Sequence, residues 1–403
     1  MRNRLPLLFA LPVAGALLLP AIADGQIIDV WLGTSANRAS KGIYHTTLDT
    51  QSGKLSPHGK RGNGGLAAEI RGPGFLCLHP SKPVLYAVGN LDGVGSVVAY
   101  KIQGDPGSRT LALMSSVAVG DAGACHVSVH PKLPLLITAQ YSGGSCAVFE
   151  LDDNGGVVRR KQLLRHEGGS GIVARRQDKP HAHWSGFSPD GRFAFVPDLG
   201  MDAVVIYSVD SENLKLTPHG KGQAIAGGGP RHMKFHPSGK YIYLLNELDL
   251  SVTVFDYDAK AGTMTAKQTV AAVDKDELAK EKFASASEIR VSQDGRFVYS
   301  ANRGHDTLTA YRVDAADGKL SVIQRIPIRG ATPRNFALAA DDRWVLAAGQ
   351  DSHTLAVFQR DAQSGLLTYH RSIISTPAPI CVLPMPKLET SAAAAGADGN
   401  DAN

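Results

Sequence analysis

One unit is repeated along this chain, and the repetition constrains the fold more than any other feature. A copy consists of an apolar run, a tight turn, a second apolar run, a polar loop and a third run. Looser copies begin at Gly74 and Cys125. The clearest copies are HAHWSGFSPDGRFAFVPDLGMDAVVIYSVD from His181, GGPRHMKFHPSGKYIYLLNELDLSVTVFDYD from Gly228, ASEIRVSQDGRFVYSANRGHDTLTAYRVD from Ala286 and TPRNFALAADDRWVLAAGQDSHTLAVFQRD from Thr332.

The length and number of the copies predict a closed ring of small sheets. Successive first strands start roughly 44 to 58 residues apart, which is the length of a propeller blade. The last first strand, near Ala378, has no second or third run after it, but such runs stand at the other end of the chain from Ile27 and Lys41. We therefore predict an all-β, seven-bladed β-propeller whose last blade is closed by N- and C-terminal strands, an arrangement that hides the sheet edges.

The two ends of the chain differ in composition from the repeats. Residues 1–23 have two arginines, an uncharged apolar stretch and a small-residue end at Ala21-Ile22-Ala23, a pattern typical of a cleaved export signal. An uncleaved membrane anchor is the alternative. Residues 389–403 are rich in Ala, Gly and Asp and are predicted to be a disordered tail. The propeller is expected to span residues 24–388, and the protein to be periplasmic or secreted.

Charge and cysteine usage argue against several classes of function. The chain has 42 basic and 37 acidic residues, interspersed without basic runs, which argues against a nucleic-acid partner. After signal cleavage we expect no membrane association, and we expect a monomer. The four cysteines, which show no metal-ligand spacing, are expected to be buried free thiols. No cofactor and no metal are predicted.

The repeat also predicts where a site lies. Because neighbouring strands run antiparallel, the start of strand one and the end of strand two lie at the same end of each blade. A purely structural ring would repeat one residue type at these positions, but here the types differ. Channel-facing positions carry one imidazole, one carboxylate and three guanidinium groups, which suits an anionic or oxygen-rich small molecule. These residues are His183, Arg231, Glu247, Arg303 and Arg334. The alternative is that Arg231 and Glu247 form a structural ion pair.

Specific motifs resemble those of a known family. The segments GGPRHMKFHPSGKYIYLLNELDLSVTVFDYD, SEIRVSQDGRFVYSANRGHD and FSPDGRFAFVPDLGMDAVVIY resemble the seven-bladed propeller lactonases of the 6-phosphogluconolactonase type, to which carboxymuconate cyclase is related. The resemblance covers about residues 27–388. It implies hydrolysis of a sugar-acid lactone without a metal, with catalytic residues at His183, Arg231, Glu247 and Arg303. Because an export signal is predicted, an unphosphorylated lactone such as gluconolactone is the expected substrate.

Lactone opening requires a base, a water molecule and stabilisation of an oxyanion. We expect Glu247 or His183 to act as the base, and Arg231 and Arg303 to polarise the carbonyl. Neither a GxSxG motif nor a Cys/His pair in the basin is recognised, so no acyl-enzyme is expected. The residues expected to orient substrate are Arg334, Gln350 and Asn90.

Two other functions fit the same fold. A propeller can serve as an exported binding module without enzymatic activity, because the fold alone does not determine function. Exposed aromatic patches on one face would favour that reading. The other alternative is a cyclase of the carboxymuconate type, which turnover of muconates would favour.

Overall fold

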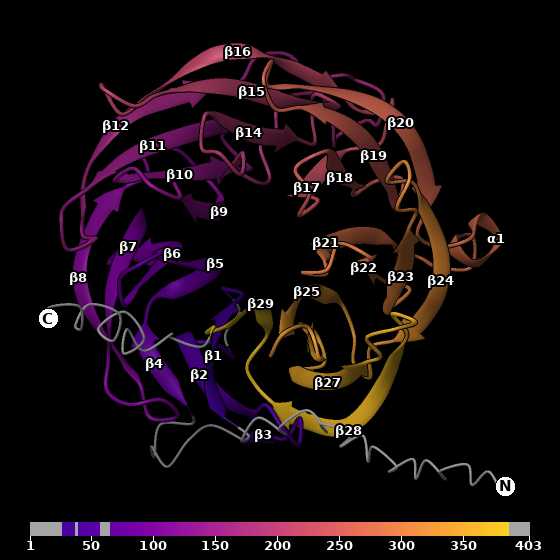
Figure 1. The fold of residues 1–403 in the computed structure, drawn as a ribbon. Helices are drawn as coiled ribbons and strands as arrows, with labels where there is room; N and C mark the ends of the chain where they lie inside the picture. Colours follow the sequence, from indigo (N-terminus) through magenta and orange to yellow (C-terminus); the bar gives the residue numbers. More distant parts are fainter. Residues whose placement is uncertain (1–25, 37–38, 57–64, 387–403) are drawn as a thin grey trace, which may run out of the picture.

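Seven small antiparallel sheets are arranged around a central axis, which confirms the predicted seven-bladed propeller (Figure 1). The computed structural model describes residues 26–36, 39–56 and 65–386. The predicted signal segment 1–23 and tail 389–403 lie outside the described residues. Six blades contain four strands each, in sequence order from the axis outward.

The first three blades follow the N-terminal strands. Blade 1 contains β5 (Arg71–Leu78), β6 (Val84–Leu91), β7 (Val94–Gln103) and β8 (Thr110–Ala118). Blade 2 contains β9 (Ala124–Val129), β10 (Leu135–Gln140), β11 (Ser145–Leu151) and β12 (Val157–Arg165). Blade 3 contains β13 (Gly186–Phe187), β14 (Phe193–Asp198), β15 (Ala203–Asp210) and β16 (Lys215–Gln223).

Blades 4 to 6 complete the regular series. Blade 4 contains β17 (Pro230–Phe235), β18 (Tyr241–Asn246), β19 (Ser251–Asp258) and β20 (Thr263–Ala271). Blade 5 contains β21 (Ser285–Val291), β22 (Phe297–Arg303), β23 (Thr307–Val313) and β24 (Leu320–Pro327). Blade 6 contains β25 (Pro333–Ala339), β26 (Trp344–Gly349), β27 (Thr354–Arg360) and β28 (Leu367–Ser375).

Blade 7 joins the two ends of the chain, as the sequence predicts. The C-terminal strand β29 pairs antiparallel with the N-terminal strand β1, from Val30 opposite Pro384 to Thr34 opposite Pro379. Strand β29 lies at the axis, so the last strand of the chain closes the ring (Figure 1). The strands of this blade are β29 (Pro379–Pro384), β1 (Ile27–Thr34), β2 (Gly42–Asp49), β3 (Leu55–Ser56) and β4 (Leu66–Glu69).

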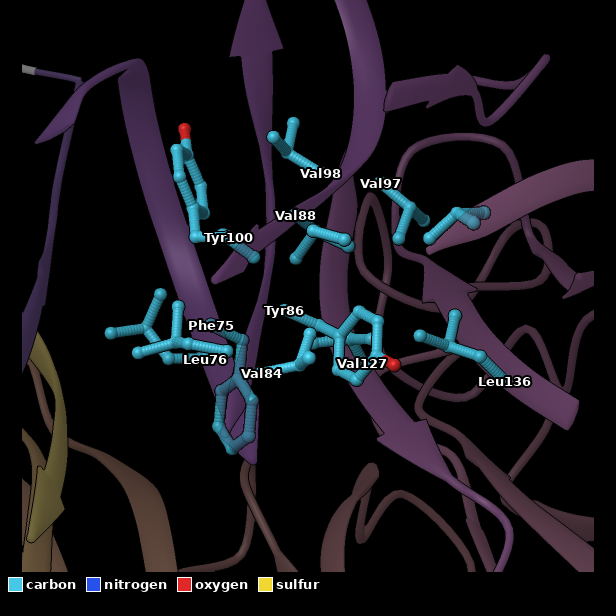
Figure 2. Close-up of a cluster of buried hydrophobic side chains, with 14 of the residues drawn as sticks. Phe75, Leu76, Val84, Tyr86, Val88, Val97, Val98, Tyr100, Val127 and Leu136 are labelled. Carbon is cyan, nitrogen blue, oxygen red and sulfur yellow. The ribbon is translucent and has the colours of Figure 1, made fainter. Parts of the chain in front are cut away.

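The core lies between neighbouring blades, because each sheet packs on a sheet at both of its faces. Strand two is therefore buried on both faces rather than alternating, as in β18, whose residues after the first are all buried. Figure 2 shows one such interface, where Tyr86 and Val97 of blade 1 lie beside Val127 and Leu136 of blade 2. Burial of this apolar surface is the main force that holds the ring together.

A repeated hydrogen bond fastens neighbouring blades. The tyrosine of strand two donates its hydroxyl hydrogen to a glycine carbonyl in the next blade. Tyr86 bonds Gly155 at 2.6 Å, and Tyr299 bonds Gly365 at 2.8 Å. Both glycines have positive φ, a conformation that residues with a side chain seldom adopt. The same repeat position thus serves one packing function in several blades.

The remaining features of the described part are few. The charged segment DKDELAKEK contains the short helix α1 (Lys275–Leu278), which projects outside the ring (Figure 1). Within the described ranges, no helix has the length and hydropathy needed to cross a bilayer. All four cysteines are free, but Cys77 and Cys125 are only half-buried, whereas full burial was expected.

Candidate active site

β-Bulges in the innermost strands explain why different residue types reach the channel. In β17 the pairing with β18 shifts between Pro230 and His232, so Arg231 is left out of the regular ladder. The same shift in β25 leaves out Arg334, and in β9 it leaves out Cys125. A bulge redirects a side chain without breaking the sheet. All three residues line cavities on the axis.

In blade 3 the residue that lines the channel, His183, is positioned without a β-bulge. His183 was expected to start the first strand, but β13 begins only at Gly186. His183 lies in the extended segment before it and is held by a backbone hydrogen bond of 3.0 Å from its N–H to the carbonyl of Pro197. The single bridge between Ala182 and Asp198 aligns this segment with β14. His183 is thus positioned by the blade without belonging to the strand.

Glu247 is the centre of an ion cluster at the mouth of the channel. Its Oε2 atom accepts a hydrogen bond of 2.8 Å from Nε of Arg231, and Nη2 of Arg303 lies 3.3 Å from the same oxygen. Its Oε1 atom accepts a hydrogen bond of 2.6 Å from Nη2 of Arg176. Nε2 of His183 lies 3.7 Å from Oε2. The structure therefore brings all four predicted catalytic residues together.

Burial and charge set the protonation states of this cluster. Burial raises the pKa of Glu247, but Arg303 and Arg231 lower it more, and the pKa lies well below its usual range. Burial, with a further contribution from Arg231, lowers the pKa of His183 well below its ordinary value. At neutral pH, Glu247 is therefore ionised and His183 is neutral.

Cys125 lies beside His183, with 3.9 Å between Sγ and Nδ1. The expectation that the basin lacks a Cys/His pair is therefore wrong. The bulge in β9 produces the pair, and the pairing register that creates a bulge cannot be read from the sequence of one strand. Burial raises the pKa of the Cys125 thiol to about 12, so the sulfur is protonated at neutral pH and is a weak nucleophile.

Two further residues of the basin were not recognised in the sequence. Arg176 belongs to the long connection between β12 and β13, outside the repeated unit, and Gln177 anchors this connection to the carbonyl of Leu199 at 2.9 Å. Phe283, in the connection before β21, lines the basin and is 56% exposed. Because neither occupies a repeat position, comparison of the copies could not find them.

The basin itself is a cavity of about 360 Å³ at the channel mouth. Arg334 lines it, and its guanidinium has no hydrogen bond or ion pair with any described residue. Nε of the buried Arg303 also has no partner there. The guanidinium of Arg334 is therefore available to a bound molecule, whereas Nε of Arg303 is enclosed by protein. The described lining residues are Gly123, Ala124, Cys125, Tyr141, Ser142, Arg176, His183, Glu247, Phe283, Arg303 and Arg334.

The other two predicted substrate residues lie elsewhere on the rim. Asn90 lines a neighbouring cavity that shares Gly123 and Ala124 with the basin. Gln350 follows β26 and lines neither cavity, and its backbone N–H donates to the carbonyl of Thr332 at 3.1 Å. Contact with a substrate at Asn90 or Gln350 stays a prediction.

A smaller chamber of about 170 Å³ lies behind the basin, and His183, Arg231 and Arg334 border it. His232 also lines this chamber. Its Nε2 atom lies 3.1 Å from Nη1 of Arg231. Its Nδ1 atom lies 3.1 Å from Oε1 of the fully buried Glu288. A polar chain thus connects the interior of the channel with the mouth.

Metal binding does not fit this basin. The carboxylate of Glu247 is occupied on both oxygens by guanidinium groups, and the surrounding positive charge repels a cation. In the described ranges, no three His, Cys, Asp or Glu side chains are grouped as metal ligands.

Comparison with known proteins identifies the family. The family described as "Lactonase, 7-bladed beta-propeller" matches residues 29–384. A relative from Bacillus subtilis, named 6-phosphogluconolactonase, is 33% identical over 352 residues, which cover 87% of this chain and 97% of the relative. Fold and sequence thus define a propeller hydrolase of lactones. The chain belongs to the seven-bladed β-propeller lactonases and is a lactonase enzyme, as its motifs predict.

Solved structures agree with this assignment. A periplasmic gluconolactonase from Pseudomonas aeruginosa has a TM-score of 0.81 and 28% identity, covering 90% of this chain and 99% of that chain. A putative 6-phosphogluconolactonase from Bacteroides fragilis has a TM-score of 0.81 and 26% identity, covering 91% and 100%. Some of these proteins are thus named for a phosphorylated lactone, and one is named for the unphosphorylated lactone.

Proposed function

We propose that this lactonase hydrolyses an unphosphorylated aldonolactone, such as gluconolactone, by direct attack of water in the basin. The observation that carries the proposal is the position of His183, whose Nε2 atom lies 3.7 Å from Oε2 of a Glu247 that three arginines hold in place. A neutral imidazole accepts a proton, and the carboxylate 3.7 Å away stabilises the imidazolium that forms. Both oxygens of Glu247 are already engaged by arginines, so His183 is the better placed of the two to take a water proton.

The reaction divides into addition and elimination. The water oxygen bonds to the lactone carbonyl carbon while one water proton moves to His183. Arg303 and Arg334, which line the basin, together with Arg231, which borders the adjoining chamber, stabilise the negative charge on the carbonyl oxygen. The bond between the carbonyl carbon and the ring oxygen then breaks, and the ring oxygen takes the proton from His183. The product is the open hydroxy acid.

The choice of an unphosphorylated substrate rests on two points. Residues 1–23 carry the features of an export signal, and a structurally similar protein is named a periplasmic gluconolactonase. The excess positive charge of the basin does not require a phosphate, because the reaction itself creates an oxyanion and a carboxylate. We further propose that the mature enzyme is periplasmic or secreted, which N-terminal sequencing of the exported protein tests.

The experiment compares gluconolactone with its 6-phosphate, and wild type with Arg231→Ala and Glu247→Gln. We expect wild type to prefer the unphosphorylated lactone, and each variant to lose about 10²–10³-fold in kcat/KM. The matched control is the exposed ion pair of Arg159 and Glu150, which lie 2.8 Å apart on the outer strands. Arg159→Ala and Glu150→Gln should leave kcat/KM unchanged. Folded basin variants with wild-type kcat/KM would exclude this site.

A further inference from the structure

We propose that the cavity beside the basin is a subsite for a second sugar unit, so that the preferred substrate is an aldonolactone of a disaccharide. This inference rests on the proposed lactone hydrolysis and names its substrate class. The cavity has a volume of about 400 Å³. It shares Gly123 and Ala124 with the basin, so a molecule that fills the basin extends into it along the rim.

The lining of this cavity, here called the rim subsite, leaves room for a ring. Seven of its ten lining residues are glycine or alanine, so the walls are largely backbone. Glycine permits a ligand to approach the main chain closely. Gly72 and Gly123 have positive φ, at 61° and 74°, which residues with a side chain seldom adopt. The ten residues are Ala36, Arg71, Gly72, Gly89, Asn90, Gly95, Asp121, Ala122, Gly123 and Ala124.

The three polar side chains of the rim subsite suit hydroxyl groups. Neither Arg71 nor Asn90 has a side-chain hydrogen bond or ion pair with any described residue. Arg71 offers donors, and the amide of Asn90 offers both a donor and an acceptor. Asp121 is held in place by Ser145 and by Arg165, each 2.8 Å from its Oδ2 atom.

This mixture favours a neutral sugar over a phosphate. Sugar hydroxyls both donate and accept, and therefore match a set that contains an amide, a guanidinium and a carboxylate. The carboxylate of Asp121, which lines the same cavity, can accept a hydrogen bond from a sugar hydroxyl but not from an ionised phosphate, which has no hydrogen to donate. The unpaired guanidinium of Arg334, in contrast, lines the basin.

A single substitution can fill the rim subsite without strain. Gly95 lies on β7 and lines the cavity, and a Cβ added there would meet no atom within 4 Å. Gly95→Phe therefore places a ring in the subsite. Gly220→Phe is the matched control, because Gly220 on β16 also has nothing within 4 Å of an added Cβ and is not among the cavity-lining residues.

The assay measures kcat/KM for gluconolactone, its 6-phosphate and cellobionolactone. We expect wild type to prefer cellobionolactone, Gly95→Phe to lower only that value by at least about tenfold, and Gly220→Phe to change none. Equal effects of Gly95→Phe on both unphosphorylated lactones would overturn the subsite. A decrease of kcat/KM in Gly95→Phe for the phosphorylated lactone alone would show that the cavity binds the phosphate. That result would overturn the sugar subsite as well.

Binding of cellobionate, the stable product, separates this inference from the proposed reaction. Calorimetry should show that wild type binds cellobionate more tightly than gluconate and that Gly95→Phe abolishes the difference. Tight, Gly95-dependent binding without lactone turnover would reject the reaction and keep the subsite. Lactone turnover with no preference for the disaccharide in either assay would reject the subsite and keep the reaction.

Discussion

The carboxylate of Glu288 determines which nitrogen of His232 faces Arg231. Oε1 of Glu288 lies 3.1 Å from Nδ1 of His232, and Nη1 of Arg231 lies 3.1 Å from Nε2 of the same ring. An arginine can only donate, so Nε2 accepts and the proton resides on Nδ1, which donates to Glu288. Glu288 is thus a positioning residue that acts on Arg231 through His232.

The first prediction tests this series of hydrogen bonds, from Glu288 through His232 to Arg231, with the variant Glu288→Gln. The amide keeps an acceptor for His232, but its NH₂ group then opposes Nδ2 of Asn335, which donates to Glu288 in wild type. We expect Arg231 to lose its fixed orientation, so that kcat falls about tenfold while KM changes little. Steady-state kinetics measure this, with circular dichroism as the check for folding.

A compensating substitution makes this test specific. In Glu288→Gln/Asn335→Asp the new carboxylate accepts from the glutamine amide and can still accept from the backbone N–H of Val382, which bonds Asn335 at 2.9 Å. The double variant should recover most of the lost kcat. Wild-type kcat in the folded single variant would show that Glu288 does not position Arg231.

The second prediction concerns the pH dependence of kcat/KM. Because burial lowers the pKa of His183, the ring is neutral at pH 7 and becomes protonated only when the pH falls through that lowered value. Activity should therefore persist below pH 6.5 and decline at lower pH. His183→Asn should lower the plateau by about 10²–10⁴-fold and remove this decline. Rates are corrected for spontaneous lactone opening, and an unchanged acid limb in the variant would exclude His183 as the base.

The third prediction separates direct water attack from thiol catalysis. Cys125 lies 3.9 Å from His183, but burial keeps its thiol protonated at neutral pH. We expect Cys125→Ala to retain kcat/KM within about threefold, since no bond to sulfur forms. Mass spectrometry of acid-quenched wild type should show no covalent adduct. An adduct that disappears in Cys125→Ala would instead establish an acyl-enzyme.

The repeat pattern predicted the ring, its closure and the convergence of the four candidate catalytic residues, because each depends on equivalent positions in successive copies. It placed Arg231 and Arg334 in the channel but could not give the reason. Both sit at β-bulges, and a bulge depends on the pairing register, which a single strand does not reveal.

Residues outside the repeat could not be predicted in the same way. Arg176 reaches Glu247 from a connection that has no counterpart in the other blades, so nothing in the sequence marks it. Gln350 occupies the same repeat position as Glu247 and Arg303, at the end of the second strand of its blade. It nevertheless lines neither cavity of the channel. Equivalent sequence positions therefore predict which blade a residue belongs to and its height along the channel axis. The direction of its side chain depends on local packing.

The fourth prediction is that activity survives removal of divalent metals. Both oxygens of Glu247 are bound by arginines, and the unpaired guanidinium of Arg334 adds positive charge to the basin. A divalent cation would be repelled from this position. Dialysis against EDTA should leave kcat/KM unchanged, and added Mg²⁺, Ca²⁺ or Zn²⁺ should not raise it. Loss of activity that a metal restores would contradict the mechanism.

The last prediction concerns closure of the ring. Strand β29 fills the axial position of blade 7, where it pairs with β1 and buries Cys381 and Val382. A chain ending after Thr376 lacks this strand, so β1 becomes an unpaired edge and the core beside blade 6 opens to water. We expect this variant to be insoluble or to lose more than about 10 °C in Tm.

A second truncation serves as the control for closure. A chain ending after Pro386 keeps β29 and the hydrogen bond of 2.8 Å from the N–H of Met385 to the carbonyl of Asp29. It removes residues 387–403, most of which the composition predicts to be a disordered tail, so its Tm and kcat/KM should equal those of wild type. Arg231, Arg303 and Arg334 lie on blades 4, 5 and 6, and the packing of these blades on one another depends on a closed ring. The shorter chain should therefore also lose activity wherever it remains soluble. Full activity in that chain would show that the basin forms without closure.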